Sequence, residues 1–171
     1  MPQYGPRVEY ALHTLLNLSL APVDTAPSAR DLADFQKLPV AFMRKLLTQL
    51  ERSGLIVGAE GVRGGWRLSR PAAGITVLEI VDAAQGRDVL FECREIRARC
   101  ALWPDDDPPR AARSGVCEIH AAMLAGERAM RAELASHTLA DIAARVGAKS
   151  PRYVARDVPA WFADRYSGRR S

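Results

Sequence analysis

The strongest constraint on the fold comes from residues 28–70, where two short helical patterns precede a hairpin pattern. Ser28 and Asp31 have the spacing of a capping box, in which side chains satisfy the free amides of a new helix, and they predict a helix over residues 29–35. Pro39 suits the first position of the next helix, and Gly54 ends it. The apolar residues of that helix recur at helical spacing and are Phe42, Met43, Leu46, Leu47 and Leu50. Two helices joined by a tight turn form a helix-turn-helix.

The hairpin pattern that follows predicts a winged helix, which is a DNA-binding fold. Residues 55–59 and 66–70 are short strand-like runs separated by a glycine-rich tip. The tip glycines, which permit positive φ angles, are Gly61, Gly64 and Gly65. Arg63 and Arg67 offer cations to phosphates or to a minor groove. The alternative is an ordinary surface hairpin with solvated charges.

We expect the DNA contacts to come from the second helix of the motif and from the wing. Helix N-termini reach base edges in this fold, so the first two turns should carry specificity. Arg44 can pair with guanine through two hydrogen bonds, whereas Lys45 is better suited to a phosphate. A solvated helix face is the alternative for both. The predicted contact residues are Val40, Ala41, Arg44, Lys45, Thr48, Gln49, Arg63, Gly64, Gly65 and Arg67.

Further helical patterns flank this motif. The predicted helices cover residues 7–21, 76–86, 116–135 and 138–146, with a short one at 159–166. Helix 116–135 is rich in small residues and lightly charged, so pairing with a second copy of the chain is expected. Arg169 and Arg170 at the C-terminal end are expected to fray. The fold class is mostly α, and the predicted domains are a winged helix-turn-helix at 1–86, a cysteine-bearing loop at 87–115, dimerisation helices at 116–146 and a tail at 147–171.

Three cysteines, Cys93, Cys100 and Cys117, point to metal binding or redox chemistry, because an odd set is poorly suited to structural disulfides in a reducing cytosol. Glu9 and His13 lie one turn apart on the flank of the first helix, so both can point at one metal pair. Cys117 begins the longest helix, whose dipole favours a thiolate. Taken singly, Glu9 and His13 are more simply interpreted as an intrahelical pair at the core margin. Cys117 is more simply a buried small side chain.

Composition limits the remaining choices. The chain has 171 residues, 48% of them hydrophobic, which is enough for one core with room for a second small lobe or dimer arm. A net charge of +4 only weakly favours an anionic partner. The sequence has no apolar run of membrane-spanning length and no signal-peptide pattern, so a cytoplasmic protein is expected. No nucleotide loop, nucleophile and base pair or zinc-hydrolase motif is present, so an enzyme is not expected.

The chain resembles the winged-helix family of iron-sulfur regulators that includes IscR, NsrR and RsrR. The resemblance covers most of residues 1–146 and rests on Val8-Glu-Tyr-Ala-Leu-His13, Gly54-Leu-Ile-Val, Gly64-Gly-Trp-Arg-Leu-Ser-Arg-Pro71 and Ile75-Thr-Val-Leu-Glu-Ile-Val81. Glu9 with His13, Phe91-Glu-Cys93-Arg-Glu-Ile-Arg and Val116-Cys117-Glu-Ile are most similar to the RsrR type. That type implies a homodimer on double-stranded DNA and a 2Fe-2S cluster held by Glu9, His13, Cys93 and Cys117, with the N-terminal ligands supplied across the dimer.

Two candidate ligands stay open. Six residues separate Cys93 from Cys100 and sixteen separate Cys100 from Cys117, a wider spacing than in three-cysteine members, so Cys100 is favoured as a non-ligand. His120 follows Cys117 at Cys-x-x-His spacing and competes with His13, because the IscR type uses a histidine there. Mixed imidazole ligation raises the reduction potential of such clusters, which suits a redox sensor. The alternatives are a thiol-switch or zinc-binding regulator without iron and a winged-helix module for protein interaction.

Overall fold

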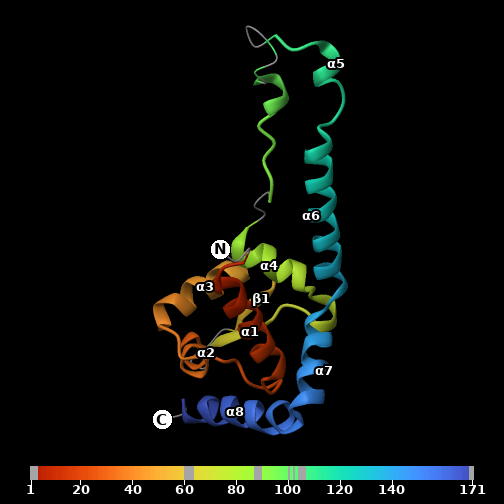
Figure 1. Ribbon diagram of the computed structural model, residues 1–171. Helices are drawn as coiled ribbons and strands as arrows, with labels where there is room; N and C mark the ends of the chain where they lie inside the picture. Colours follow the sequence, from red (N-terminus) through yellow and green to blue (C-terminus); the bar gives the residue numbers. More distant parts are fainter. Residues whose placement is uncertain are drawn as a thin grey trace. The chain divides into compact units, whose positions relative to one another are not determined.

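The computed structural model describes residues 4–59, 64–86, 90–99, 101, 103 and 107–169. The chain divides into two units, one made of Met1–Gly86 with Leu134–Ser171 and the other of Arg87–Glu133. In the first unit, α1 (Pro6–Leu20), α2 (Ala29–Gln36) and α3 (Val40–Arg52) precede an antiparallel hairpin of β1 (Ile56–Ala59) and β2 (Gly65–Leu68) (Figure 1). The predicted mostly helical winged helix-turn-helix is confirmed.

The rest of the first unit is helical and surrounds α1. Its elements are a 3-10 turn at Ala72–Gly74, α4 (Val77–Gln85), α7 (Leu139–Lys149), a π-helical turn at Tyr153–Asp157 and α8 (Val158–Gly168). Helix α1 packs against α3, α4, α7 and α8. Figure 1 shows α8 crossing the end of α1 close to α2, so the C-terminal helix is part of the DNA-binding unit.

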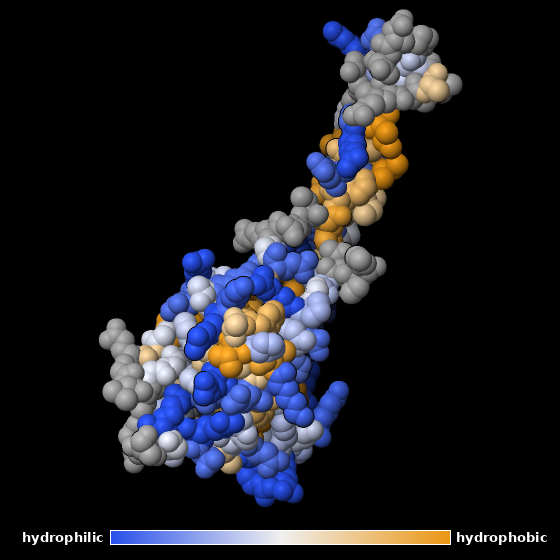
Figure 2. Space-filling view, turned by 90° about the vertical axis from the view of Figure 1, so that its left-hand side faces the viewer, coloured by the Kyte–Doolittle hydropathy of each residue, from blue (hydrophilic) through white to orange (hydrophobic). Residues whose placement is uncertain are grey.

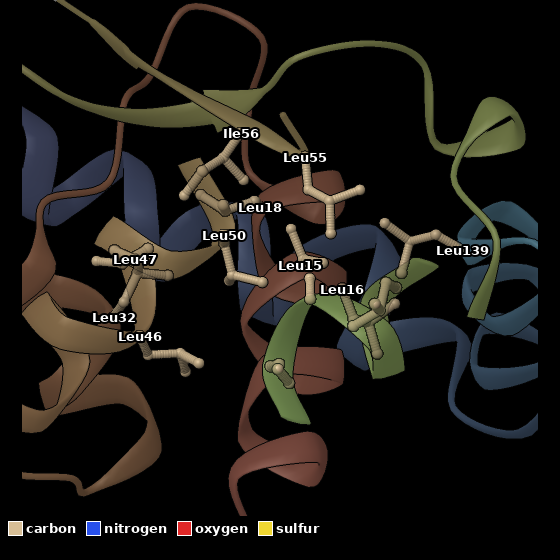
Figure 3. Packing of buried hydrophobic residues seen from close by; sticks show 14 of the residues in the cluster. Leu15, Leu16, Leu18, Leu32, Leu46, Leu47, Leu50, Leu55, Ile56 and Leu139 are labelled. Atoms are coloured by element: carbon tan, nitrogen blue, oxygen red, sulfur yellow. The ribbon is translucent and has the colours of Figure 1, made fainter. Parts of the chain in front are cut away.

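The core of this unit is an aliphatic cluster centred on α1. Figure 3 shows Leu15 and Leu16 in its middle, with leucines of α3 on one side and Leu139 of α7 on the other. The α3 leucines Leu46, Leu47 and Leu50, together with Leu55 and Ile56 at the start of the hairpin, are 0 to 2% exposed. Each such burial contributes about 1.5–3 kcal/mol, so the periodic leucines of α3 fix which face remains outside.

All three Ser/Thr-x-x-Asp/Glu patterns that begin helices in this unit form complete capping boxes. They join Ser28 to Asp31, Thr76 to Glu79 and Thr138 to Asp141. Lys37 ends α2 in the left-handed conformation, with φ 54° and ψ 44°, and so produces the tight turn before α3. Local sequence chemistry therefore sets most helix boundaries here.

Several predicted boundaries were wrong. Pro39 is the N-cap of α3 and Val40 is its first helical residue, because the extended backbone at Pro39 has ψ 131°. Helix α8 runs to Gly168, beyond the predicted 159–166, because the hydrogen bonds of Arg169 hold its C-terminal end. Arg169 is hydrogen-bonded rather than frayed, and Arg170 lies outside the described residues.

The second unit contains a short 3-10 helix at Ile96–Arg99, α5 (Arg110–Arg113) and most of α6 (Glu118–Ser136). Helix α6 begins two residues after the predicted start, because the Ala121 amide donates to the Cys117 carbonyl oxygen and makes Cys117 the residue that precedes the helix. None of its 19 residues is buried within the described chain. In the part of the chain that the structure describes, no helix is long and apolar enough to cross a membrane.

Candidate functional site

The exposed face of α3 carries four of the residues predicted to contact DNA. Ala41, Arg44, Lys45 and Thr48 are exposed, and the Thr48 hydroxyl donates to the Arg44 carbonyl oxygen at 3.0 Å. These residues remain outside because the leucines of the same helix are needed in the core. The result is a surface with two cations and one hydroxyl on two successive turns.

The other two α3 residues of the predicted set lie at the edge of the core. Val40 is half-buried and packs against the hydrophobic cluster. The amide nitrogen of Gln49 donates to the carbonyl oxygens of Ala83 and Ala84 in α4, at 2.6 and 3.2 Å. Gln49 thus holds α3 against α4, a role that its exposed-face spacing did not indicate.

The wing is fixed at its base to the loop between α1 and α2. The Trp66 amide donates to the Pro27 carbonyl oxygen at 2.9 Å, and the exposed Arg67 donates through Nε to the Thr25 carbonyl oxygen at 3.3 Å. Arg63 and Gly61 lie outside the described residues.

Gly65 serves a different purpose from the one predicted. A Cβ atom there would lie 2.6 Å from the Ala26 carbonyl carbon and 2.6 Å from the Pro27 carbonyl oxygen, and φ at Gly65 is not in the positive region. The residue must be glycine because two backbone segments approach each other, a long-range relationship that the local pattern does not reveal. Gly64 accepts a hydrogen bond from Arg169 through its carbonyl oxygen at 3.2 Å.

Glu9 and His13 share one pocket in the first unit. Both side chains are exposed on α1, one turn apart, and they line a space of about 490 Å³ with Tyr4, Pro6 and Leu12. Pro6 begins α1, so the pocket lies at the N-terminal end of the helix. One carboxylate and one imidazole are thereby available side by side.

Cys93 and Cys117 share a second pocket, of about 470 Å³, in the second unit. Both thiols are free and half-buried, and the apolar lining comes from Phe91, Ile96 and Ile119. The described residues include no group of three or more His, Cys, Asp or Glu side chains close enough to hold a metal. The cysteine pocket also has Glu92 in its lining, and the two predicted ligand pairs belong to different units of the chain.

Arg97 is a residue of the cysteine pocket that the sequence did not single out. Its guanidinium binds both carboxylate oxygens of Glu95, at 2.5 and 2.8 Å, and donates to the Gly115 carbonyl oxygen at 3.3 Å. Glu95 has φ 48°, an uncommon conformation for a residue with a side chain. This arrangement joins the Cys93 segment to the turn that precedes Cys117, and no local spacing signals it.

The thiol of Cys117 is stabilised as an anion, as expected for a helix N-terminus. The backbone amide of His120 lowers the pKa of Cys117 below its ordinary 9.0, helped by the amide of Ile119 and the charge of Arg97, while burial and Glu95 act the other way. The Ala121 amide donates to the Cys117 carbonyl oxygen at 2.8 Å, which places Cys117 at the cap position of α6. The direction of this shift agrees with the prediction that Cys117 readily forms a thiolate.

The two open candidates differ in what the structure describes. Cys100 lies outside the described residues. His120 is half-buried beside Phe91, with ring centroids 5.9 Å apart, and its Nδ1 has no hydrogen-bond partner among the described residues. An imidazole nitrogen without a partner near the cysteine pocket keeps His120 available as a ligand.

The fold and the exposed α3 face define a winged-helix DNA-binding protein. The family model for Rrf2, described as an iron-dependent transcriptional regulator, matches residues 5–145. The chain therefore belongs to the Rrf2 family, whose members are transcription regulators rather than enzymes, and it is a DNA-binding regulator.

Individual relatives agree with this family. The chain is 27% identical over 136 residues to protein rrf2 of Nitratidesulfovibrio vulgaris, covering 80% of this chain and 83% of that one. It is 32% identical over 78 residues to IscR of Cereibacter sphaeroides, covering 44% and 50% of the two chains.

Solved structures support the fold. The structure of T. potens IscR has a TM-score of 0.65 at 17% identity and covers 87% of this chain and 91% of that one. The structure of CymR, the global cysteine regulator of B. subtilis, has a TM-score of 0.63 at 21% identity and covers 85% and 98%. At these identities the likeness extends to the fold alone.

Proposed function

We propose that the protein is a homodimeric regulator of the RsrR type, whose DNA affinity depends on a 2Fe-2S cluster. The observation that carries the proposal is that the four predicted ligands share pockets in pairs, Glu9 with His13 and Cys93 with Cys117. A 2Fe-2S cluster needs two protein ligands on each iron, so two pairs match its demand.

The chemistry of the donors fits this group. Cys117 has a lowered pKa, so a thiolate, the form that binds iron, is readily supplied. Arg97 lines the same pocket, and its positive charge favours anionic sulfur at Cys117. Glu9 and His13 would complete the site with harder oxygen and nitrogen donors, and Cys100 would not be needed. Such a cluster, when bound, would supply a one-electron redox input.

A dimer would account for the surface of α6. Ile119 and Met123 are 67% and 44% exposed one turn apart, and Val116 just before the helix is 64% exposed. Figure 2 shows hydrophobic side chains on the surface of this unit. Ile96 of the same unit is 73% exposed. Exposed apolar side chains on a helix that buries none of its own residues indicate packing against a partner, and a second copy supplies the same surface.

The link from the site to DNA would run through α1. Glu9 and His13, which would hold the cluster, lie on this helix, so loss of these ligands would release α1 from the site. Helix α1 packs against α3 and α4, so its shift would change how the two recognition helices of a dimer reach their half-sites.

The direct test of the cofactor is an absorption spectrum of anaerobically purified protein, with iron and acid-labile sulfide contents. We expect a coloured protein whose iron and sulfide fall in Glu9→Ala, His13→Ala, Cys93→Ser and Cys117→Ser, while Cys100→Ala and His120→Ala retain both. Retention of full iron in Glu9→Ala and His13→Ala, with loss in His120→Ala, would contradict the RsrR-type ligand set.

A second candidate function is a thiol-switch regulator without iron. It is favoured by one observation, that Cys93 and Cys117 are free thiols lining the same pocket. A colourless protein that forms a Cys93–Cys117 disulfide on mild oxidation would support it, and bound zinc would support a zinc site. Lack of salt-dependent retention on DNA would instead support a protein-interaction module.

A further inference from the structure

The guanidinium of Arg169, just after α8, joins three parts of the DNA-binding unit. One terminal nitrogen donates to the carbonyl oxygens of Ala26 and Gly64, both at 3.2 Å. The other forms an ion pair with the Asp31 carboxylate. The side chains are largely buried, with 21% of Arg169 and 7% of Asp31 exposed. One group at the C-terminal end thus reaches the wing, the loop before α2 and α2 itself.

The Asp31 carboxylate is also held by hydrogen bonds that do not involve Arg169. The same oxygen accepts hydrogen bonds from the Ser28 amide and the Ser28 hydroxyl, both at 2.8 Å, as part of the capping box of α2. A carboxylate buried this deeply is stable as an anion only with charged or amide partners. Arg169 supplies the cation, and its position is therefore tied to the first helix of the helix-turn-helix.

Helix α8 holds Arg169 in place through its own packing on α2. Phe162 and Trp161 lie against Phe35 with ring centroids 5.1 and 5.0 Å apart. Arg165, one turn before Arg169, forms an ion pair with Asp34 at 3.0 Å. Helix α8 is therefore attached to α2 independently of the Arg169 contacts.

Arg169 contacts the wing at its base, beside other contacts with the loop before α2. Its base is held to the loop before α2 by the Trp66 amide bond to Pro27 and by the close approach at Gly65. Arg169 adds a donor to Gly64, the residue just before that point, and bridges it to Ala26 of the same loop. Gly64 is also the residue that follows the wing tip.

We propose that Arg169 is a positioning residue for the wing: through one guanidinium it holds the base of the wing at a fixed place relative to α2 and α3. The C-terminal helix is then a working part of the DNA-binding unit. Guanidinium is suited to this task because its planar fork presents donors in several fixed directions. A lysine at residue 169 would have the same charge to pair with Asp31. It would lack the additional guanidinium nitrogen that donates to the carbonyl oxygens of Gly64 and Ala26.

The experiment is hydrogen exchange of the full-length protein, read for the peptide that contains Trp66 and for a core peptide of α3. In Arg169→Ala we expect exchange at the Trp66 amide to rise at least about tenfold, because local opening becomes easier, while the α3 core stays protected. Arg169→Lys should show the same loss at the wing with less effect on α2. Arg165→Ala is the matched control, since it removes an arginine of α8 and its ion pair but leaves the wing protected.

Unchanged exchange at the wing in Arg169→Ala would overturn the proposal, as would an equal rise in Arg165→Ala, because general packing of α8 would then be responsible. If Arg169→Ala unfolds altogether, Arg169→Lys decides between the same two outcomes. A fluorescent random-sequence duplex of about 30 base pairs should bind Arg169→Ala several-fold more weakly than Arg165→Ala. If the wild-type protein fails to bind this duplex, DNA binding is contradicted, and the exchange data still decide the role of Arg169.

Discussion

Gly65 lies so close to Pro27 that a Cβ atom at residue 65 would stand 2.6 Å from the Pro27 carbonyl oxygen. The same oxygen accepts the hydrogen bond of the Trp66 amide at 2.9 Å. The second strand of the wing is therefore pressed onto the loop between α1 and α2, and this contact relates the wing to the helix-turn-helix. A side chain at residue 65 would separate the two.

Substitution of Gly65 by alanine should therefore destabilise the protein and displace the wing. We expect Gly65→Ala to lower the free energy of unfolding by about 1–3 kcal/mol, since backbone atoms and not a flexible side chain must move. Gly58→Ala is the matched control in the partner strand, because its Cβ would meet only the Glu51 carboxylate oxygen at 3.6 Å. Denaturant unfolding compares the two, and equal stabilities would show that residue 65 tolerates a side chain.

The capping box of α4 predicts an acid-dependent loss of stability. The Thr76 backbone amide lowers the pKa of Glu79 below its ordinary 4.5, with smaller help from the Thr76 hydroxyl and Arg70. Because the folded-state pKa is depressed, this stabilisation is present above pH 4.5 and is lost as the pH falls below it.

We expect Glu79→Gln to be less stable than the wild type by about 1 kcal/mol or less at neutral pH, since this carboxylate is half exposed. The difference should shrink as the pH falls below 4.5. Urea unfolding at a series of pH values measures it. A constant difference at all pH values would mean that the carboxylate charge does not stabilise the cap.

The lowered pKa of Cys117 predicts selective reactivity in the cluster-free, reduced protein. Iodoacetamide should alkylate Cys117 with a midpoint below pH 9.0, and Arg97→Ala should move that midpoint upward because one favourable charge is lost. Arg94→Ala is the control, since Arg94 lines the same pocket but is not a cause of the shift. Mass spectrometry of the Cys117 peptide gives the alkylation rates. A midpoint unaffected by Arg97→Ala would show that the Arg97 charge does not lower the pKa of Cys117.

The exposed cation Lys45 predicts a specific change in the salt dependence of DNA binding. If Lys45 contacts a phosphate, Lys45→Ala should lower the slope of log affinity against log salt by about 1, because fewer counterions are released. Arg152→Ala removes the same charge from the C-terminal region, where Arg152 lies 3.5 Å from Asp157, and should leave the slope unchanged. Parallel slopes for Lys45→Ala and the wild type would place Lys45 outside the interface.

Much of the first unit could be predicted from the sequence because its signals are local. Ser28, Thr76 and Thr138 each sit three residues before an acidic partner, and every one begins a helix as the capping chemistry requires. The leucine spacing of α3 identified its buried face correctly. These signals depend on neighbours within one helical turn and hold in any tertiary context.

The features that could not be predicted depend on contacts between distant residues. Gly65 is needed because of Ala26 and Pro27, Gln49 is held by α4, and Arg169 is fixed by Asp31. None of these partners stands at a spacing that a helix or strand period would reveal. The four-residue spacing of Glu9 and His13 was enough to predict that they lie side by side on one helix. The proximity of Cys93 and Cys117 could not be predicted in this way, because their shared pocket depends on how a long loop folds.

The most direct test of the central claim is the DNA affinity of one protein sample in two redox states. The oxidised, anaerobically purified protein is first used to select DNA duplexes from a random library. The dissociation constant for these duplexes is then measured before and after the protein is reduced with dithionite. We expect the dissociation constants to differ by about tenfold or more, within the usual range for coupled sites, and to become equal in Cys93→Ser. Equal affinity of the wild-type protein in both states would contradict redox control by a cluster.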